Sequence, residues 1–267
     1  MELWQMAVVL LAGIVAGTVN TVVGAGTLIT FPLLVTLGIQ PLTANVSNGV
    51  GLVPAAVTGA WGYRRELAGW WPTVARMGAM SAVGGVLGAL LLLVAPAETF
   101  TQVVPWLLVL AAVLAAAQPR VGAWVRRRAA ERAAGADVTE TTHTDLSTRP
   151  LTLGLALGIA ATGVYGGYFG AAQGVVLISL LGILWSSDLQ RANGAKNVLA
   201  GVANLISALI FIVGGLVDWR LAGLIAVGAA IGGVIGARVG RRIPAALLRT
   251  LIVVVALTAA VVLWVGD

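Results

Sequence analysis

Five stretches of this chain are almost free of charged residues. They cover residues 3–23, 74–95, 103–117, 221–237 and 247–265. A helix needs about 20 apolar residues to cross the hydrocarbon of a bilayer, and these runs lack the alternation expected for strands of a membrane barrel. The composition agrees, because 59% of the residues are hydrophobic and 10% are charged, whereas soluble domains carry roughly 25% charged residues. We therefore predict an all-α integral membrane protein.

Glycines interrupt an apolar segment in each half of the chain. The first run meets Gly24 and Gly26 and resumes over residues 27–37, a piece too short to cross a bilayer upright. In the second half, the run from Leu151 meets several glycines up to Gly170 and resumes as a short piece to about Trp185. Broken apolar segments at corresponding positions are typical of transporter binding sites.

The sequences that follow the two breaks are similar. GAGTL (24–28) is followed by ANVSN (44–48), and GAAQG (170–174) is followed by ANGAKN (192–197). An internal duplication of this kind predicts two related structural units. We expect a first transmembrane repeat over 1–118, a cytoplasmic arginine-rich linker over 119–150 and a second transmembrane repeat over 151–267. Together the repeats would hold about eight full spans and two short glycine-broken segments.

The arginines predict how these segments are oriented, because positively charged loops between apolar runs stay in the cytoplasm. The positions expected there are Arg64, Arg65, Arg126, Arg127, Arg128, Arg132, Arg238, Arg241, Arg242 and Arg249. This pattern needs an odd number of segments in each half, about five, so the two repeats are expected to be inverted in the cytoplasmic membrane. If each glycine-broken run formed one continuous helix, each half would have four spans and the repeats would be parallel.

Lys196 is the only lysine of the chain, and it lies within a predicted helix of the second half. A charged group at membrane depth is costly unless a partner or water stabilises it, so Lys196 is a candidate ligand for an anion. The alternative is that it snorkels to the nearer interface or pairs with Asp188. Asn193, Asn197 and Asn204 share one helical face. Their amides could line a polar path or only hydrogen-bond neighbouring helices.

The glycine breaks could bind an anion as well. Each break leaves backbone N–H groups at the start of a new helix, where the helix dipole favours negative charge. We expect the polar and glycine residues around both breaks to line one cavity between the halves. The candidate substrate-binding residues are Asn20, Gly24, Gly26, Thr27, Asn45, Asn48, Tyr165, Gly170, Gln173, Asn193, Lys196 and Asn197.

The sequence gives little support for an enzyme. A hydrolase within the membrane would need a serine with a base, paired aspartates or a metal cluster in the apolar part. The single histidine, His143, lies in the central polar loop, and the chain has no cysteine. We therefore expect no catalytic activity, no metal and no cofactor. The arginines fit membrane orientation rather than nucleic-acid binding.

Three segments carry a resemblance to a known family: VNTVVGAGTLITFPLLVTLGIQPLTANVSNGVGLVP (19–54), GVYGGYFGAAQGVVLISLLG (163–182) and DLQRANGAKNVLAGVANLISALIFI (188–212). They resemble the TauE/SafE sulfite exporter family, also called the 4-toluene sulfonate uptake permease family. The resemblance implies a bacterial or archaeal membrane permease for anionic sulfur compounds such as sulfite, sulfonates, sulfoacetate or thiosulfate.

The residues and the resemblance together predict a permease that moves a small anion by alternating access. An inside-negative potential favours expulsion of a monovalent anion by about 2.3 kcal/mol per 100 mV, which favours export over uptake. The alternatives are an anion channel built on the same cavity and a non-transporting membrane scaffold that binds a partner through the arginine-rich linker. The expected partners are the anionic substrate and the lipid bilayer, and the chain could form a homo-oligomer. No nucleic acid is expected.

Overall fold

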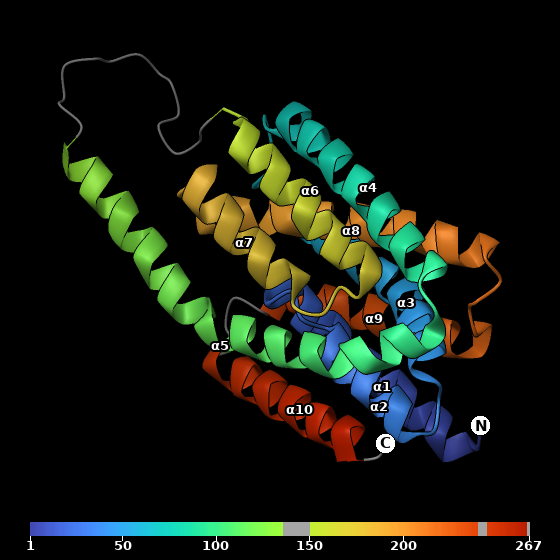
Figure 1. Ribbon diagram of the computed structural model, residues 1–267. Coiled ribbons are helices and arrows are strands. Elements are labelled where there is room, and N and C mark those ends of the chain that lie inside the picture. Colours follow the sequence, from blue (N-terminus) through green and yellow to red (C-terminus); the bar gives the residue numbers. More distant parts are fainter. Residues whose placement is uncertain (136–149, 240–244, 266–267) are drawn as a thin grey trace.

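The computed structural model describes residues 1–135, 150–239 and 245–265, and within these ranges the chain forms ten helices and no strand. The helices are α1 (Leu3–Val22), α2 (Thr27–Thr36), α3 (Pro41–Gly62), α4 (Trp71–Val94), α5 (Ala97–Gly135), α6 (Leu153–Tyr168), α7 (Gln173–Leu184), α8 (Leu189–Val213), α9 (Trp219–Val239) and α10 (Ala245–Val265). Figure 1 shows them packed as one bundle. Among the described residues, five helical segments are long and apolar enough to span a membrane: α1, α4, the first part of α5, α8 and α9.

The two halves have the same order of helices. α1–α5 and α6–α10 each begin with a helix, a glycine break and a short helix, as the sequence predicts. Trp71 and Trp219, which begin α4 and α9, are 148 residues apart, whereas Gly24 and Gly170 in the breaks are 146 residues apart. The difference of two residues lies in the short helices, because α2 has 10 residues and α7 has 12.

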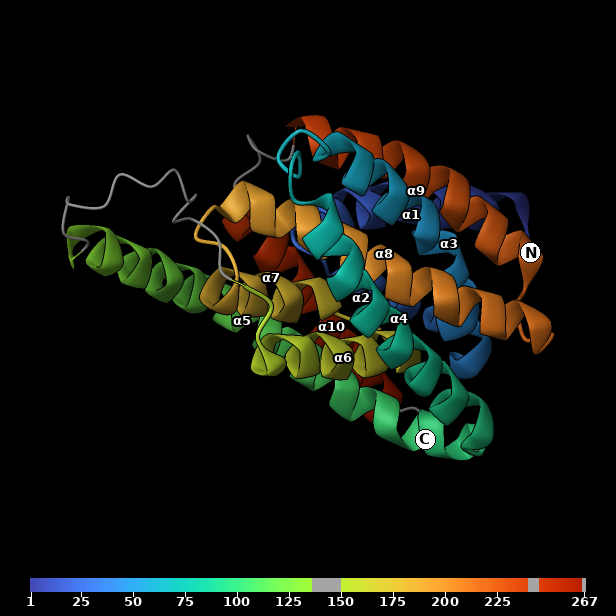
Figure 2. The same cartoon turned by 90° about the horizontal axis from the view of Figure 1, so that it is seen from above.

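Each main contact between helices of the two halves has an equivalent contact when the halves are exchanged. α1 packs on α9 in the same way that α6 packs on α4, and α3 and α8 contact each other. At one seam a Cβ on Gly232 would collide with the carbonyl of Ile14, and at the other a Cβ on Gly84 would collide with the carbonyl of Ala160. Small residues let membrane helices approach this closely. Figure 2 shows α8 between α4 and α3, near the centre of the bundle.

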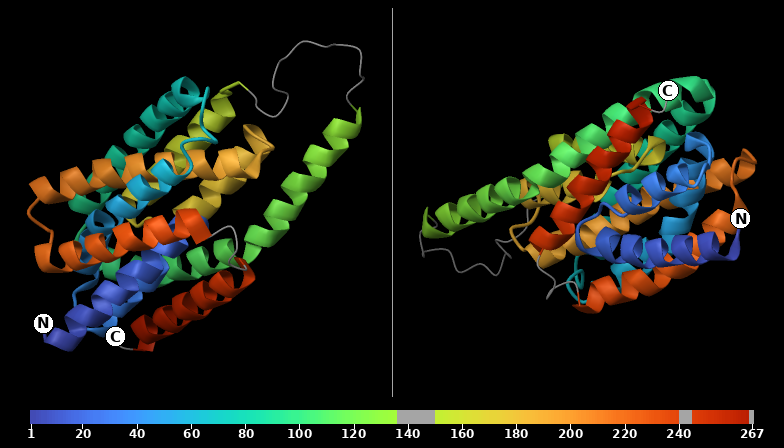
Figure 3. Two further views of the ribbon diagram at one scale, coloured as in Figure 1. Left: turned by 180° about the vertical axis from the view of Figure 1, so that it is seen from behind. Right: turned by 90° about the horizontal axis from the view of Figure 1, so that it is seen from below.

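α5 is longer than the apolar run in the sequence. That run was expected to end at about residue 117, and the helix continues through Pro119 to Gly135, into the segment predicted as an arginine-rich linker. Alanine and arginine are strong helix formers, and they dominate this part of the chain. The end of α5 extends beyond the bundle (Figures 1 and 3). Residues 136–149, which include His143 and most of the predicted polar loop, lie outside the described ranges.

Candidate functional site

Both breaks are closed by the same backbone geometry. Gly24 follows α1 with a φ of +84°, and Gly170 follows α6 with a φ of +76°. Glycine adopts such left-handed angles without a steric penalty and commonly ends helices in this way. The N–H of Gly24 donates to the carbonyl of Val19 at 3.1 Å, and the N–H of Gly170 donates to that of Tyr165 at 3.0 Å.

The two breaks touch each other. The N–H of Gly174, in the first turn of α7, donates to the carbonyl of Gly24 at 3.0 Å. A Cβ on either glycine would overlap the backbone of the other. The aromatic rings of Phe31 in α2 and Phe169 in the second break also meet edge to face, with their centroids 5.3 Å apart. Because Gly24 occupies the N–H of Gly174, that group is not open to an anion in this state.

Lys196 lies at this junction and is 1% exposed. Its Nζ donates to the carbonyls of Asn20 at 3.2 Å and Thr21 at 3.0 Å, at the end of α1. The Nδ2 of Asn197 donates to the same Thr21 carbonyl at 3.4 Å. A cation at the C-terminus of a helix is stabilised by unpaired carbonyls and the helix dipole. Asn20, a predicted substrate-binding residue, therefore contacts Lys196 through its backbone oxygen.

Neither alternative for Lys196 agrees with the structure. Its side chain is buried, so it does not snorkel to an interface. Asp188 caps the start of α8 instead of pairing with Lys196, since its Oδ1 accepts from the backbone N–H groups of Gln190 at 2.8 Å and Arg191 at 3.2 Å. The ammonium is thus held by carbonyl groups.

Asn48 takes the place of Lys196 in the first half, 148 residues earlier. Unlike Lys196, it does not reach the C-terminal end of a helix. Its Nδ2 donates to Oγ1 of Thr27 at 3.2 Å, and its Oδ1 accepts from the hydroxyl of Thr30. All three side chains are buried. Asn48 therefore ties α3 to the start of α2, where Gly26 is the residue before the helix.

Asn45 and Asn193 also correspond between the halves, but their hydrogen bonds differ. Nδ2 of Asn45 donates to the carbonyl of Tyr168, the last residue of α6, at 3.0 Å. Asn193 is 7% exposed, and its Oδ1 has no hydrogen-bond partner among the described residues. A buried acceptor of this kind needs a partner, so Asn193 is available to a ligand or water.

The other two predicted side chains brace the second break. The hydroxyl of Tyr165 donates to the carbonyl of Ala171. Nε2 of Gln173 donates to the carbonyl of Thr162 at 3.4 Å, and the side chain covers Gly166. Both groups therefore act within the α6–α7 segment, which also contains Ala172 in a left-handed conformation at φ 57°.

A small polar cavity lies beside the second break. Its volume is about 20 Å³, which is about the room that one water molecule needs. It is lined by Thr27, Asn45, Gly49, Leu52, Gly166, Gly167, Tyr168, Phe169, Gly170, Asn204, Ser207 and Phe211. The sequence prediction included three of these, missed Ser207 and Gly49, and placed Asn204 only on a polar face. Ser207 follows Asn204 by three residues, and this helical spacing was the available signal.

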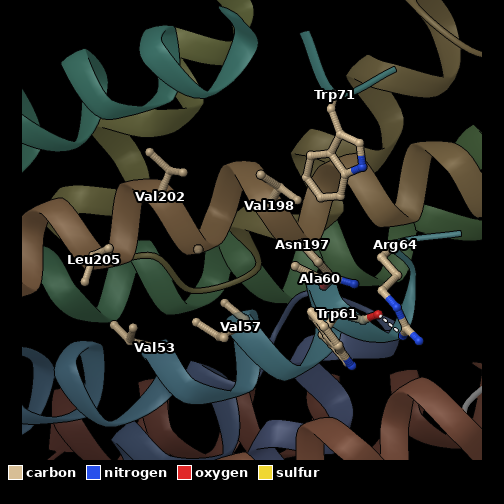
Figure 4. Close-up of a pocket in the computed structure, with 12 residues that line it drawn as sticks. Val53, Val57, Ala60, Trp61, Arg64, Trp71, Asn197, Val198, Val202 and Leu205 are labelled. Atoms are coloured by element: carbon tan, nitrogen blue, oxygen red, sulfur yellow. Dashed lines mark hydrogen bonds between the residues drawn. The ribbon is translucent and has the colours of Figure 1, made fainter. Parts of the chain in front are cut away.

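An apolar groove opens on another side, between α3 and α8 (Figure 4). Valines and alanines make up half of the residues that line it, and its volume is about 580 Å³. Figure 4 shows Arg64, Trp61 and Trp71 near one end and Val53 and Leu205 near the other. The guanidinium of Arg64 lies 4.5 Å from the ring centroid of Trp61 and donates to its carbonyl at 2.9 Å.

The chemical groups around the breaks indicate what the site can bind. No three His, Asp or Glu side chains come together as metal ligands in the described ranges. The groups gathered around the breaks are an ammonium, carboxamides, hydroxyls and backbone amides. Such groups can hold a polar ligand by hydrogen bonds.

Comparison with known proteins gives the family. The sequence profile described as Sulfite exporter TauE/SafE matches residues 9–263. The chain is 26% identical to the probable membrane transporter protein YfcA of Escherichia coli (strain K12) over 224 residues, which are 84% of this chain and 76% of that protein. It is 25% identical to the probable membrane transporter protein ORF9 of Sinorhizobium sp over 256 residues, or 96% and 91% of the two chains. No solved structure matches. The chain therefore belongs to the TauE/SafE sulfite exporter family of membrane transporters.

Proposed function

We propose that this protein is a permease that carries a small anion across the cytoplasmic membrane, and that the anion is a sulfur compound such as sulfite, a sulfonate, sulfoacetate or thiosulfate. The family description supports this substrate class. The observation that carries the proposal is the buried ammonium of Lys196 at the contact between the two helix breaks. A membrane protein retains a buried charge of this kind mainly where it serves binding or transport.

The anion site we infer lies at this junction. The ammonium has three protons, and two donate to the carbonyls of Asn20 and Thr21. The third proton is therefore available to the substrate. The amides of Asn193, Asn197, Asn45 and Asn48, the hydroxyl of Thr27 and the N–H groups around Gly26 complete the donor set, whereas the N–H of Gly170 is used by the carbonyl of Tyr165. Because Lys196 is only 1% exposed, the described state is closed to substrate, and the helices around the junction must separate for the anion to enter.

Alternating access is the mechanism that the repeat favours. The contacts between the halves occur in equivalent pairs, with α1 on α9 and α6 on α4. Five helices in each half would place the two repeats in opposite orientations, with the arginine-rich linker in the cytoplasm. An inverted pair can expose one central site to either side in turn.

Export is the direction that fits the charges. The membrane potential drives a monovalent anion outward by about 2.3 kcal/mol per 100 mV, so that efflux needs no coupled ion. Around the junction, the described side chains that bond Lys196, Asn45 and Asn48 include no carboxylate that could relay a proton.

Purified protein in proteoliposomes tests the proposal. A thermal-shift screen against sulfite, thiosulfate, methanesulfonate and acetate first identifies an anion that binds, because a ligand of the native state raises the apparent stability. Vesicles loaded with that anion should then release it at a saturable rate that increases with an inside-negative potential. Absence of flux for every anion would contradict the proposal. Single-channel currents that do not saturate with anion concentration would indicate an anion channel instead of a permease.

A further inference from the structure

The polar cavity beside the second break corresponds to a place that a cation fills in the other half. In the first break, the ammonium of Lys196 binds the carbonyls of Asn20 and Thr21. The equivalent residues, 146 positions later, are Gly166 and Gly167, and both line the cavity. The end of α6 thus lies at the cavity as the end of α1 lies at Lys196.

The cavity exists because two side chains differ between the repeats. Asn48 replaces Lys196 and turns toward Thr27 and Thr30. Gly49 replaces Asn197, whose amide binds Thr21 in the other half. A Cβ on Gly49 would find no atom within 4 Å. The space that the lysine and asparagine side chains occupy on one side of the bundle is therefore left open on the other.

Oxygen atoms suited to a cation surround this space. Asn45 lines the cavity and is 5% exposed, and its Nδ2 donates to the carbonyl of Tyr168, which leaves the carboxamide oxygen for another partner. Ser207, which is 3% exposed, uses its hydroxyl proton on carbonyls of its own helix and keeps its oxygen lone pairs for another partner. Asn204 adds a second amide oxygen.

The size and charge of the lining select the ion. The described residues that line the cavity include neither Asp nor Glu, whereas sites for Ca²⁺ and Mg²⁺ normally use carboxylates. The available room is that of one water molecule. The C-terminal ends of broken helices coordinate Na⁺ in transporters.

We propose that this cavity binds a monovalent cation of the size of Na⁺, held by the last carbonyls of α6 together with Asn45, Asn204 and Ser207. The ion would bind carbonyls at the end of α6, as the ammonium of Lys196 binds carbonyls at the end of α1. This proposal does not depend on the identity of the transported anion. A bound cation would add a second positive charge beside the junction of the two breaks.

Thermal unfolding of the purified, anion-free protein tests the site. The melting temperature is measured in NaCl and in choline chloride at equal chloride concentration. Na⁺ should raise the melting temperature of the wild type, because a ligand that binds only the folded state stabilises it by mass action. Ser207→Ala removes a ligand oxygen and Gly49→Asn fills the space with an amide, as Asn197 does in the other half. Both variants should lose the Na⁺-dependent rise.

Ser179→Ala is the matched control, because the hydroxyl of Ser179 also donates to a carbonyl of its own helix, that of Val175 at 2.7 Å, but does not line the cavity. Its response to Na⁺ should equal that of the wild type. The proposal is overturned if NaCl and choline chloride give the same wild-type melting temperature, or if both cavity variants keep the full rise. If a variant does not fold, saturable binding of radioactive Na⁺ to the wild type decides, and its absence overturns the site.

Discussion

The carbonyl of Gly24 accepts a hydrogen bond from the N–H of Gly174 at 3.0 Å, although the two residues lie in different halves of the chain. This bond joins the end of one broken helix to the beginning of another. Lys196 lies against the same point, since a Cβ on Gly174 would come within 3.1 Å of its Cδ. A movement of one half against the other would therefore change the contacts at the junction of the two breaks.

Gly174→Ala should destabilise the protein by about 1–3 kcal/mol, which is typical of overpacking a tightly packed site. The new methyl group would collide with the backbone of Gly24. Gly223→Ala, in α9, is the control, because its Cβ would meet no atom within 4 Å and alanine favours a helix. Thermal unfolding in detergent measures both. Equal stability of the two variants would mean that the glycines are not in contact.

The two glycine seams should respond equally to the same change. Gly84→Ala would place its methyl group on the carbonyl of Ala160, and Gly232→Ala would place it on the carbonyl of Ile14. Because the neighbours are equivalent, both variants should lower the melting temperature by similar amounts. A large loss in one variant with none in the other would argue against the structural equivalence of the halves.

Asn48→Ala should cost about 1–3 kcal/mol, the penalty for leaving buried polar groups unsatisfied. The substitution removes a donor from Thr27 and an acceptor from Thr30, both of which are buried. Thr36→Ala is the control, because its hydroxyl is exposed and bonds only the carbonyl of Leu33. If Asn48→Ala unfolds at the wild-type temperature, the Asn48 contacts add nothing to the attachment of α2.

The absence of cysteine allows a direct test of inverted repeats. Ala68→Cys reports the loop before α4, and Gly214→Cys reports the corresponding loop before α9. Both positions are exposed. With an impermeant maleimide on intact spheroplasts, Gly214→Cys should react and Ala68→Cys should react only after lysis. Labelling of both from the same side would require parallel repeats.

Much of the fold follows from local sequence rules. Gly24 and Gly170 are needed for positive φ angles, so the two breaks and the short helices after them could be predicted from the chain alone. The sequence allowed Lys196 either to be buried or to reach the interface. The distance of Lys196 from the end of its helix did not decide between the two. The continuation of α5 past Pro119 was not predicted, because the change in composition there suggested a linker.

The contacts within the site could not be predicted from spacing. The bond between Gly24 and Gly174 depends on how the halves dock, and no local pattern encodes it. Equivalent residues also differ in use: Asn45 caps α6, whereas the Oδ1 of Asn193 has no partner among the described residues. The extra two residues of α7 shift the register between the repeats, so alignment of the motifs alone does not give these partners.

Equilibrium binding of the anion found by the thermal-shift screen tests the central claim most directly. Lys196→Gln keeps a hydrogen-bond donor but removes the charge, and Arg220→Gln removes an exposed charge from the start of α9 as the control. A hydrogen bond to a charged group contributes about 1.5–3 kcal/mol, so Lys196→Gln should weaken binding roughly 10- to 100-fold while Arg220→Gln binds as the wild type does. Wild-type affinity in a folded Lys196→Gln protein would contradict the assignment of the anion site to this junction.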